Sequence, residues 1–304
     1  MANSPTTNSN NWPTANSMRT SPDLRAQVTD QLTALSAPGA LLHRDSNECT
    51  HHRYPITDIA RARFHQRTVD WYLGLHSPRH DGRTAIVSAG PPGAGKTTML
   101  HNLVSDIAEY RIIDADIIKD RIIEQALTDG IFDHLLTAAP LADGHSLAPR
   151  ELAGLVHLES VTLADQIRRD CVSRKENVVI EGTLTWHEQG PNIFRELADN
   201  SYTDLEVYGI DIDRATAHEQ ALDRWWQCRR RWIAGLDPWG GRFTPSDAID
   251  ICYPPTGGES VCTTNAKRFI NTAIQTGEIP NVHVTILRPT TGRLEVIYDR
   301  SYRQ

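Results

Sequence analysis

The chain has 304 residues, and 39% of them are hydrophobic, which is enough to bury the core of one large domain with an appendage. Its formal net charge of -7 argues against nucleic acid as the main partner, because such partners attract basic surfaces. No apolar run approaches the length of about 18 residues that a membrane helix needs. The five cysteines are scattered and no secretory signal is visible, so we expect reduced thiols and a cytoplasmic location.

The first part of the chain is predicted to be a tail followed by two helices. Residues 1–22 are rich in Asn, Ser, Thr and Pro and have few large apolar side chains, so they are expected to be disordered. Helical patterning begins at Pro22, with Ser21 as the cap, and a second helix is predicted over 56–75. We interpret residues 23–82 as an N-terminal helical extension.

Short apolar segments alternate with helical ones over residues 83–304. The predicted strands cover 84–89, 111–114, 177–181, 205–211 and 282–287, with 294–298 as a closing hairpin strand. Helices are expected at 95–108 and 150–174, with a looser segment at 138–149. This alternation predicts an α/β fold, in which a mainly parallel sheet is flanked by helices.

A glycine-rich turn joins the first predicted strand to the next helix, and it reads Gly90-Pro91-Pro92-Gly93-Ala94-Gly95-Lys96-Thr97-Thr98. It matches the P-loop pattern G-x-x-x-x-G-K-[ST] at every fixed position. Glycines let backbone N–H groups converge on phosphate oxygens, and the helix start adds free N–H groups and its positive dipole end. Lys96 can reach the outer phosphates, and the Thr97 hydroxyl can ligate Mg²⁺. The segment predicts a P-loop NTPase fold that binds ATP with Mg²⁺.

Two aspartates, Asp114 and Asp116, follow the second predicted strand. Ligands of open parallel sheets bind at this carboxyl edge. A phosphoryl acceptor hydroxyl needs a base within hydrogen-bond reach, so either aspartate could be that base or could hold Mg²⁺ through water. The structural alternative is an aspartate that caps the following helix.

The strand predicted at 177–181 ends in Glu181-Gly182-Thr183. Glu181 could accept hydrogen bonds from sugar hydroxyls or contact the shell of a metal, or it could simply pair with an arginine. Glu181 and Thr183 are therefore candidates for contact with a second substrate.

Arginines gather in the last third of the chain, where one predicted helix carries Arg224, Arg229, Arg230 and Arg231 together with three tryptophans. Arg242 follows a glycine-rich connection and precedes a helix start at 244–247. Arginines supply forked donors that stay charged, which suits the negative charge of a transferring phosphoryl group. The alternative for Arg229 to Arg231 is a solvated basic face.

The motifs, in this order, resemble the zeta toxin family of toxin–antitoxin systems over about Thr84 to Asp299. Besides the P-loop they are I-I-D-A-D at 112–116, V-I-E-G-T at 179–183 and D-P-x-x-x-R-x-T-P at 237–245. The resemblance implies that Asp116 is the base for the acceptor hydroxyl. It further implies that Lys96, Arg229 and Arg242 contact ATP, and that the substrate contacts lie at Asp165, Glu181 and Thr183.

Members of that family phosphorylate the 3′-hydroxyl of the aminosugar of UDP-N-acetylglucosamine, and a small helical antitoxin blocks their ATP site. The resemblance implies the same activity and a possible antitoxin partner here. Two features depart from the family pattern. Thr185 stands where the family's E-G-T-x-R has a substrate-contacting arginine, and an inserted segment at 138–149 lengthens the interval before Glu181.

We therefore predict an ATP-dependent small-molecule kinase with Asp116 as base. A kinase for another small molecule, such as an antibiotic or a nucleoside, is one alternative. A nucleotide-gated binding protein without phosphotransfer is another, although Asp116 and the arginines argue against it. A nucleic-acid-processing enzyme would need a basic groove that this acidic chain does not indicate.

Overall fold

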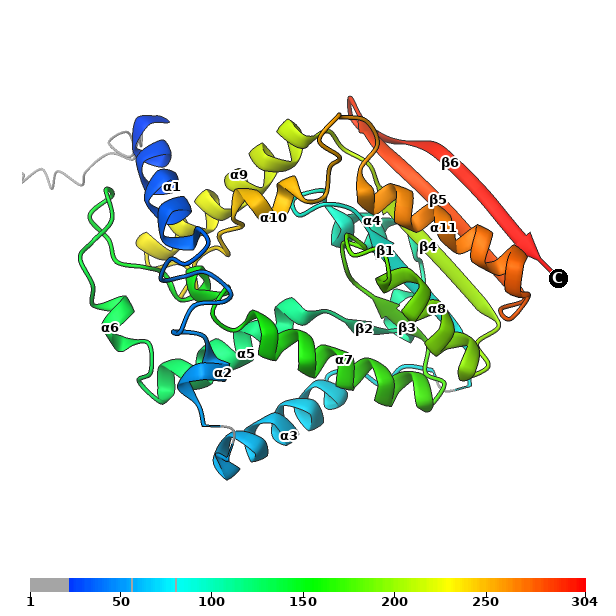
Figure 1. The fold of residues 1–304 in the computed structure, drawn as a ribbon, viewed down its shortest axis with the longest axis horizontal. Coiled ribbons are helices and arrows are strands. Elements are labelled where there is room, and N and C mark those ends of the chain that lie inside the picture. The colour runs from blue at the N-terminus through cyan, green and yellow to red at the C-terminus, as the bar shows by residue number, and fades with distance from the viewer. Residues whose placement is uncertain (1–21, 56, 80) are drawn as a thin grey trace, which may run out of the picture.

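A computed structural model describes residues 22–55, 57–79 and 81–304 (Figure 1). The predicted tail at 1–22 lies outside these residues, apart from Pro22, with which α1 begins. The helices are α1 (Pro22–Ser36), α2 (Thr50–Arg53), α3 (Ile59–Gly74), α4 (Lys96–Leu103), α5 (Ala115–Thr128), α6 (Asp133–Leu136), α7 (His157–Ser173), α8 (Gln189–Asp199), α9 (Arg214–Ile233), α10 (Ser246–Asp250) and α11 (Val261–Thr276), with 3₁₀ turns η1 (Ile107–Glu109) and η2 (Pro149–Leu152). The strands are β1 (Thr84–Ala89), β2 (Arg111–Ile113), β3 (Val178–Ile180), β4 (Asp204–Ile210), β5 (Asn281–Thr290) and β6 (Arg293–Arg303).

The six strands form one sheet in the order β2-β3-β1-β4-β5-β6. The first five are parallel, and β6 pairs antiparallel with β5 as the predicted hairpin. This confirms the predicted α/β fold with a mainly parallel sheet. Because the strands are parallel, the residues that follow β1, β2, β3 and β4 meet at one edge of the sheet.

Helices cover both faces of the sheet, because alternate residues of a strand point to opposite faces. Ala85 and Val87 of β1 belong to the large core cluster, which also contains Phe194 of α8 and Phe269 of α11. Ile86 belongs instead to a second cluster with Met99 and Leu100 of α4 and Ala217 and Ala221 of α9. The helix α4, which follows the P-loop, is thus fixed beneath the central strand.

Several predicted boundaries were wrong by a few residues. The helix expected at 95–108 ends at Leu103, where Val104 turns to extended backbone. The helix expected at 150–174 begins only at His157, because η2 and a close approach of Gly154 to the Leu42 carbonyl precede it. The helix expected at 244–247 begins at Ser246. None of the described helices has the length and apolar character that crossing a bilayer requires.

The N-terminal helices pack directly on the core. Val28 and Leu32 of α1 are fully buried in the large cluster. The Tyr72 hydroxyl of α3 donates to the Ile112 carbonyl at 2.9 Å and accepts from the Asp114 N–H at 2.9 Å. The extension thus reaches the end of β2, which Asp114 follows. Figure 1 shows the β5–β6 hairpin on the far side of the sheet from α1 and α3.

A buried ion pair attaches α3 to α7. The Arg61 guanidinium donates from Nε and Nη2 to the two carboxylate oxygens of Glu159, both at 2.7 Å, and His65 contacts the same carboxylate. Burial alone would raise the pKa of Glu159, but the hydrogen bonds from His65 and Arg61 outweigh it and lower the pKa to about 2. The ionised form of Glu159 therefore stabilises the folded chain.

We expect this pair to make the protein acid-sensitive. The ordinary pKa of 4.5 falls to about 2 on folding, so the stabilisation is present above pH 4.5 and is lost as the pH falls toward about 2. The stabilisation amounts to about 3 kcal/mol.

Glu159→Gln should lower the free energy of unfolding at pH 7 by about 3–5 kcal/mol, because Arg61 is left buried and unpaired. Urea unfolding between pH 7 and pH 3 measures both effects.

The exposed variant Glu188→Gln serves as the control for the Glu159 experiment and should unfold like the wild type. The loss of stability below pH 4.5 should be shallower in Glu159→Gln than in the wild type, because one perturbed carboxyl is gone. If the free energy of unfolding fell equally steeply with pH in Glu159→Gln and in the wild type, the Glu159 carboxylate would not cause this pH dependence.

Candidate active site

The P-loop has the backbone conformation that only glycine adopts without strain. Gly90 and Gly93 have φ angles of 143° and 84°. A Cβ on Gly90 would lie 2.8 Å from the Ile210 carbonyl oxygen, and one on Gly93 would lie 2.8 Å from the Ala217 carbonyl oxygen. The loop is therefore wedged between the end of β4 and the start of α9, and its glycines are required by sterics as well as by phosphate approach.

The Lys96 side chain bends back so that its ammonium group lies inside the P-loop. Its Nζ donates to the Gly90 carbonyl at 2.9 Å and to the Pro91 carbonyl at 3.1 Å. Burial lowers the pKa of Lys96. An ammonium that is held against neutral carbonyls in a desolvated loop is strongly stabilised by a phosphate anion, which is the interaction predicted for Lys96.

Thr97 and the end of β3 form an oxygen-rich pair beside the loop. The Thr97 hydroxyl donates to Oε2 of Glu181 at 3.0 Å. Burial, together with the charge of Asp114, raises the pKa of Glu181. The Gly90 N–H donates to the Thr183 carbonyl at 3.2 Å, which ties the end of β3 to the P-loop. A hydroxyl and a carboxylate side by side suit Mg²⁺, which prefers oxygen ligands and retains several waters.

The two aspartates after β2 have different roles. The Asp114 carboxylate accepts from the Asp116 N–H at 2.8 Å and caps α5. Burial, together with the charge of Asp116, raises the pKa of Asp114. Asp116 lies in the first turn of α5 with 41% of its side chain exposed. The Asp114 carboxylate is thus used to cap α5, whereas the Asp116 carboxylate is partly exposed.

Cations surround the Asp116 carboxylate. Lys119 donates to its Oδ1 at 2.9 Å, and Nη1 of Arg242 lies 3.6 Å from its Oδ2. Burial acts to raise the pKa of Asp116, but the charges of Lys119 and Arg242 outweigh it and hold the pKa well below its usual range. Asp116 is therefore ionised at neutral pH and can accept a hydrogen bond from an acceptor hydroxyl.

Arg242 is oriented by a carboxylate that the sequence did not single out. Its Nη2 donates to the Asp116 carbonyl at 2.7 Å and to Oδ1 of Asp120 at 2.6 Å. Arg150 binds the same Asp120 carboxylate through two hydrogen bonds of 3.0 and 2.8 Å, and its N–H donates to the Trp239 carbonyl at 3.0 Å. Asp120 and Arg150 thus hold the glycine-rich connection against α5, with Arg242 beside Asp116.

Arg229 lies in a different environment from the one that the resemblance implied. Its side chain is 0% exposed and binds two carboxylates, with Asp143 at 2.7 and 3.0 Å and Glu151 at 2.9 and 2.7 Å. Trp225 donates to the same Glu151 carboxylate at 2.8 Å. These contacts fold the inserted segment at 138–149 against α9 and occupy the donors of Arg229 that ATP would need.

Arg224, on the same helix as Arg229, is the arginine of α9 whose charge acts on the P-loop lysine. The P-loop packs on α9 at Ala221, whose N–H is 3.0 Å from a Cβ placed on Gly93. Arg224 follows one turn later and is exposed. Its charge acts on both Lys96 and Asp116 and contributes to lowering the pKa of each. The sequence contained a signal for it, because Arg224 was one of the four arginines on the predicted helix.

The side chain of Thr183 contacts the residue at the family's arginine position. The Thr185 hydroxyl donates to the Thr183 hydroxyl at 2.8 Å. It also lies 3.4 Å from the sulfur of Cys252 and 3.7 Å from that of Cys262. Both thiols are fully buried, so position 185 is enclosed in a way that suits a small residue.

Asp165, the remaining residue predicted to contact substrate, lies on α7. Its carboxylate accepts from Arg168 at 2.6 Å, and Arg168 also binds Glu196 on α8. No hydrogen bond or ion pair within the described residues connects Asp165 to Asp116, Glu181 or Thr183. Thr97 thus contacts Glu181 and Arg242 pairs with Asp116, and the charges of Lys96 and Asp116 both act on Glu181. Asp165 and Arg229 have other partners.

A strand–loop–helix P-loop at the carboxyl edge of a parallel sheet, with acids after other strands at the same edge, defines a P-loop nucleotide-binding protein. The sequence model of the family described as Zeta toxin matches residues 75–278, which is more than half of the chain. The chain therefore belongs to the zeta toxin family of kinase-like toxins, which confirms the resemblance inferred from its motifs.

Several solved structures are similar to this chain. One, from the PezAT chromosomal system of Streptococcus pneumoniae, is 15% identical over 81% of this chain and 81% of that chain, with a TM-score of 0.46. Complexes of AvrRxo1-ORF1 with AvrRxo1-ORF2, one with sulphate ions and one with ATP, are 13% identical over 79% of this chain and 67% of theirs, with TM-scores of 0.52 and 0.50. A comparison with curated proteins found no match.

Proposed function

We propose that this chain is an ATP-dependent kinase that transfers the γ-phosphoryl group to a hydroxyl of a small-molecule acceptor. One observation carries the proposal: the Asp116 carboxylate follows β2 at the carboxyl edge of the sheet and lies within ion-pair distance of Lys119 and Arg242. A carboxylate positions and deprotonates the attacking hydroxyl, and cations stabilise the charge on the transferring group.

Each group in the proposed site has a defined task. Residues Gly90 to Thr98 bind the phosphates of ATP through backbone N–H groups. Lys96, Arg224 and Arg242 supply the positive charge around the γ-phosphate. Thr97, with Glu181 behind it at 3.0 Å, would hold Mg²⁺, which neutralises charge on the phosphate oxygens when it is bound.

The adenosine end of ATP has a hollow available next to the P-loop. It has a volume of about 260 Å³ and is lined by Asp211, Ile212, Asp213, Thr216, Gly258, Arg288 and Pro289. Asp211 follows Ile210, whose carbonyl adjoins Gly90, and it is held by Arg288 at 2.7 Å. We place the base and ribose in this hollow.

For the acceptor, we propose the 3′-hydroxyl of the aminosugar of UDP-N-acetylglucosamine. Membership of the zeta toxin family supports this choice. Thr183 and Asp165 would contact the sugar nucleotide, although Asp165 must first release Arg168. Because Thr185 replaces an arginine of the family pattern, another small-molecule acceptor is the second candidate.

The proposal is tested by incubating the full chain with Mg²⁺ and ATP labelled at the γ-phosphate, together with UDP-N-acetylglucosamine. A labelled sugar nucleotide is the expected product. ATP binding without this product would move the search to other acceptors, such as nucleosides and antibiotics. ATP binding without transfer to any acceptor, accompanied by nucleotide-dependent capture of a protein, would favour a nucleotide-gated binding protein.

We also propose an antitoxin partner and a cytoplasmic location. The structures of similar fold come from the PezAT toxin–antitoxin system and from complexes of AvrRxo1-ORF1 with AvrRxo1-ORF2. A protein that covers the P-loop would protect the host cell from the kinase. The location is supported by five cysteines that are free of disulfides.

A further inference from the structure

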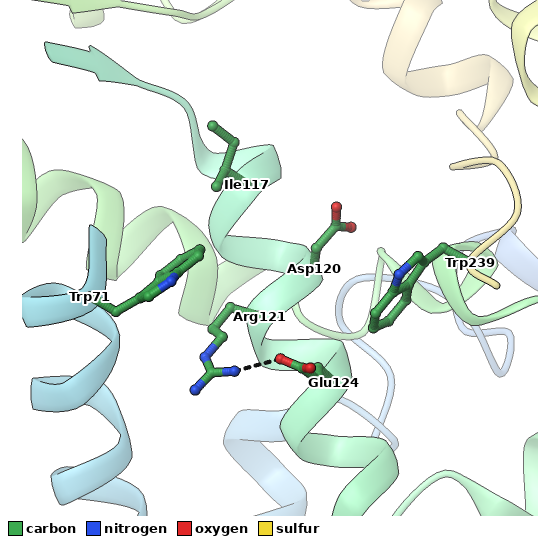
Figure 2. A pocket seen from close by; sticks show the side chains of 6 residues that line it. All are labelled: Trp71, Ile117, Asp120, Arg121, Glu124 and Trp239. Carbon is green, nitrogen blue, oxygen red and sulfur yellow. Dashed lines mark hydrogen bonds and ion pairs between the residues drawn. The ribbon is translucent and has the colours of Figure 1, made fainter. Parts of the chain in front are cut away.

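A second hollow, of about 380 Å³, opens on the surface beside α5. Figure 2 shows its two indole rings, from Trp71 of α3 and Trp239 of the connection before Arg242, on either side of the helix. Ile117 lies at the end of α5 near the strand. The charged side chains of Asp120, Arg121 and Glu124 complete the lining. A volume of this size is that of a small-ligand site.

The hollow adjoins the proposed catalytic base. Asp120 lies one helical turn after Asp116 on the same face of α5. Arg242 donates to both residues, to the Asp116 carbonyl at 2.7 Å and to the Asp120 carboxylate at 2.6 Å. A ligand that presents a hydroxyl to Asp116 can therefore extend past Asp120 toward the two tryptophans.

The lining suits a flat ring with polar edges. The Arg121 guanidinium already stacks over the Trp71 ring, at 5.7 Å from its centroid. Trp71 is 38% exposed, so part of its ring is accessible to a ligand. Arg121 also binds Glu124, which places a donor and an acceptor side by side. Nucleobases stack on indoles and present N–H donors next to ring acceptors, which such a pair can read.

We propose that this hollow is the subsite for a nucleobase of the phosphoryl acceptor. The inference rests on the proposed kinase function, since it places the acceptor's reactive hydroxyl at Asp116. Trp71 lies outside residues 75–278, the part that matches the family. The N-terminal extension thus supplies one wall of the acceptor site and takes part in the choice of acceptor.

The test uses the full chain with its P-loop saturated by Mg²⁺ and a non-hydrolysable ATP analogue. Uridine, cytidine, adenosine and guanosine, which lack phosphates, are titrated by saturation-transfer NMR. We expect at least one nucleoside to bind more tightly than ribose. Trp71→Ala and Trp239→Ala should each weaken it by about 5- to 150-fold, the range for loss of one base–aromatic stack. Trp71→Phe should retain most of the affinity.

Ile274→Ala, which removes an exposed apolar side chain from α11, is the control and should bind like the wild type. Failure of all four nucleosides to exceed ribose, or an equal loss in the control, would overturn the proposal. Asp116→Ala should still bind the nucleoside, because the base does not touch Asp116. Stacking-dependent binding therefore supports the subsite even if no phosphoryl transfer occurs, and absence of binding leaves the kinase proposal to its own assay.

Discussion

Alanine in place of Asp116 is expected to lower phosphoryl transfer by about 100- to 10,000-fold, the usual contribution of a general base. The affinity for ATP should stay the same or rise, because removal of the carboxylate frees Arg242 and Lys119, which now pair with it. Single-turnover transfer of labelled γ-phosphate measures the first effect, and equilibrium binding of a non-hydrolysable ATP analogue measures the second.

Two further variants make the Asp116 experiment interpretable. Asp116→Asn keeps the shape of the side chain and should be almost as slow as Asp116→Ala, because an amide cannot take the hydroxyl proton. Asp199→Ala removes an exposed carboxylate at the end of α8 and should transfer at the wild-type rate. Transfer by Asp116→Ala at the wild-type rate would exclude Asp116 as the base and leave Asp114 or Glu181 to be tested.

The parts of the site that the sequence predicts are those encoded locally. The P-loop is one continuous segment whose residue types follow from phosphate geometry, and its position between β1 and α4 was predicted correctly. The sheet edge was also predictable, since parallel strands bring the residues after β2 and β3 together whatever the intervening sequence. Glu181 accordingly lies beside Thr97 although 84 residues separate them.

Side-chain partners that come from distant segments could not be predicted. Arg224 and Arg229 lie five positions apart on α9, so they point about 140° away from each other around the helix. Which of the two faces the P-loop depends on Asp143 and Glu151, and these belong to the inserted segment and η2, whose path has no local signal. The family resemblance assigned the ATP contact to Arg229, and the fold buries that side chain.

The same limit applies to the N-terminal helices. Their existence followed from the helical patterning. Their docking depends on single long-range contacts such as those of Tyr72 with Ile112 and of Arg61 with Glu159. The Trp71 wall of the second hollow follows from that docking, since Trp71 precedes Tyr72 in the sequence.

Arg224→Ala is expected to impair phosphoryl transfer, whereas Arg229→Ala is expected to impair stability. Arg224 is exposed, so its loss should leave stability within about 0.5 kcal/mol. Transfer should fall by about 10³-fold or more, as when an arginine that stabilises the transferring phosphoryl group is removed. Arg229→Ala should instead lower the free energy of unfolding by about 3–5 kcal/mol, because Asp143 and Glu151 are left buried without their cation.

The comparison needs unfolding curves and transfer rates for both variants, with Arg230→Ala, an exposed neighbour on α9, as the matched control. Burial raises the pKa of Glu151 even beside Arg229, so the Arg229 variant should regain stability as the pH falls and Glu151 takes up a proton. A stable Arg229→Ala protein that loses transfer would return the ATP-contacting role to Arg229. It would also mean that the inserted segment opens to release that guanidinium when ATP binds.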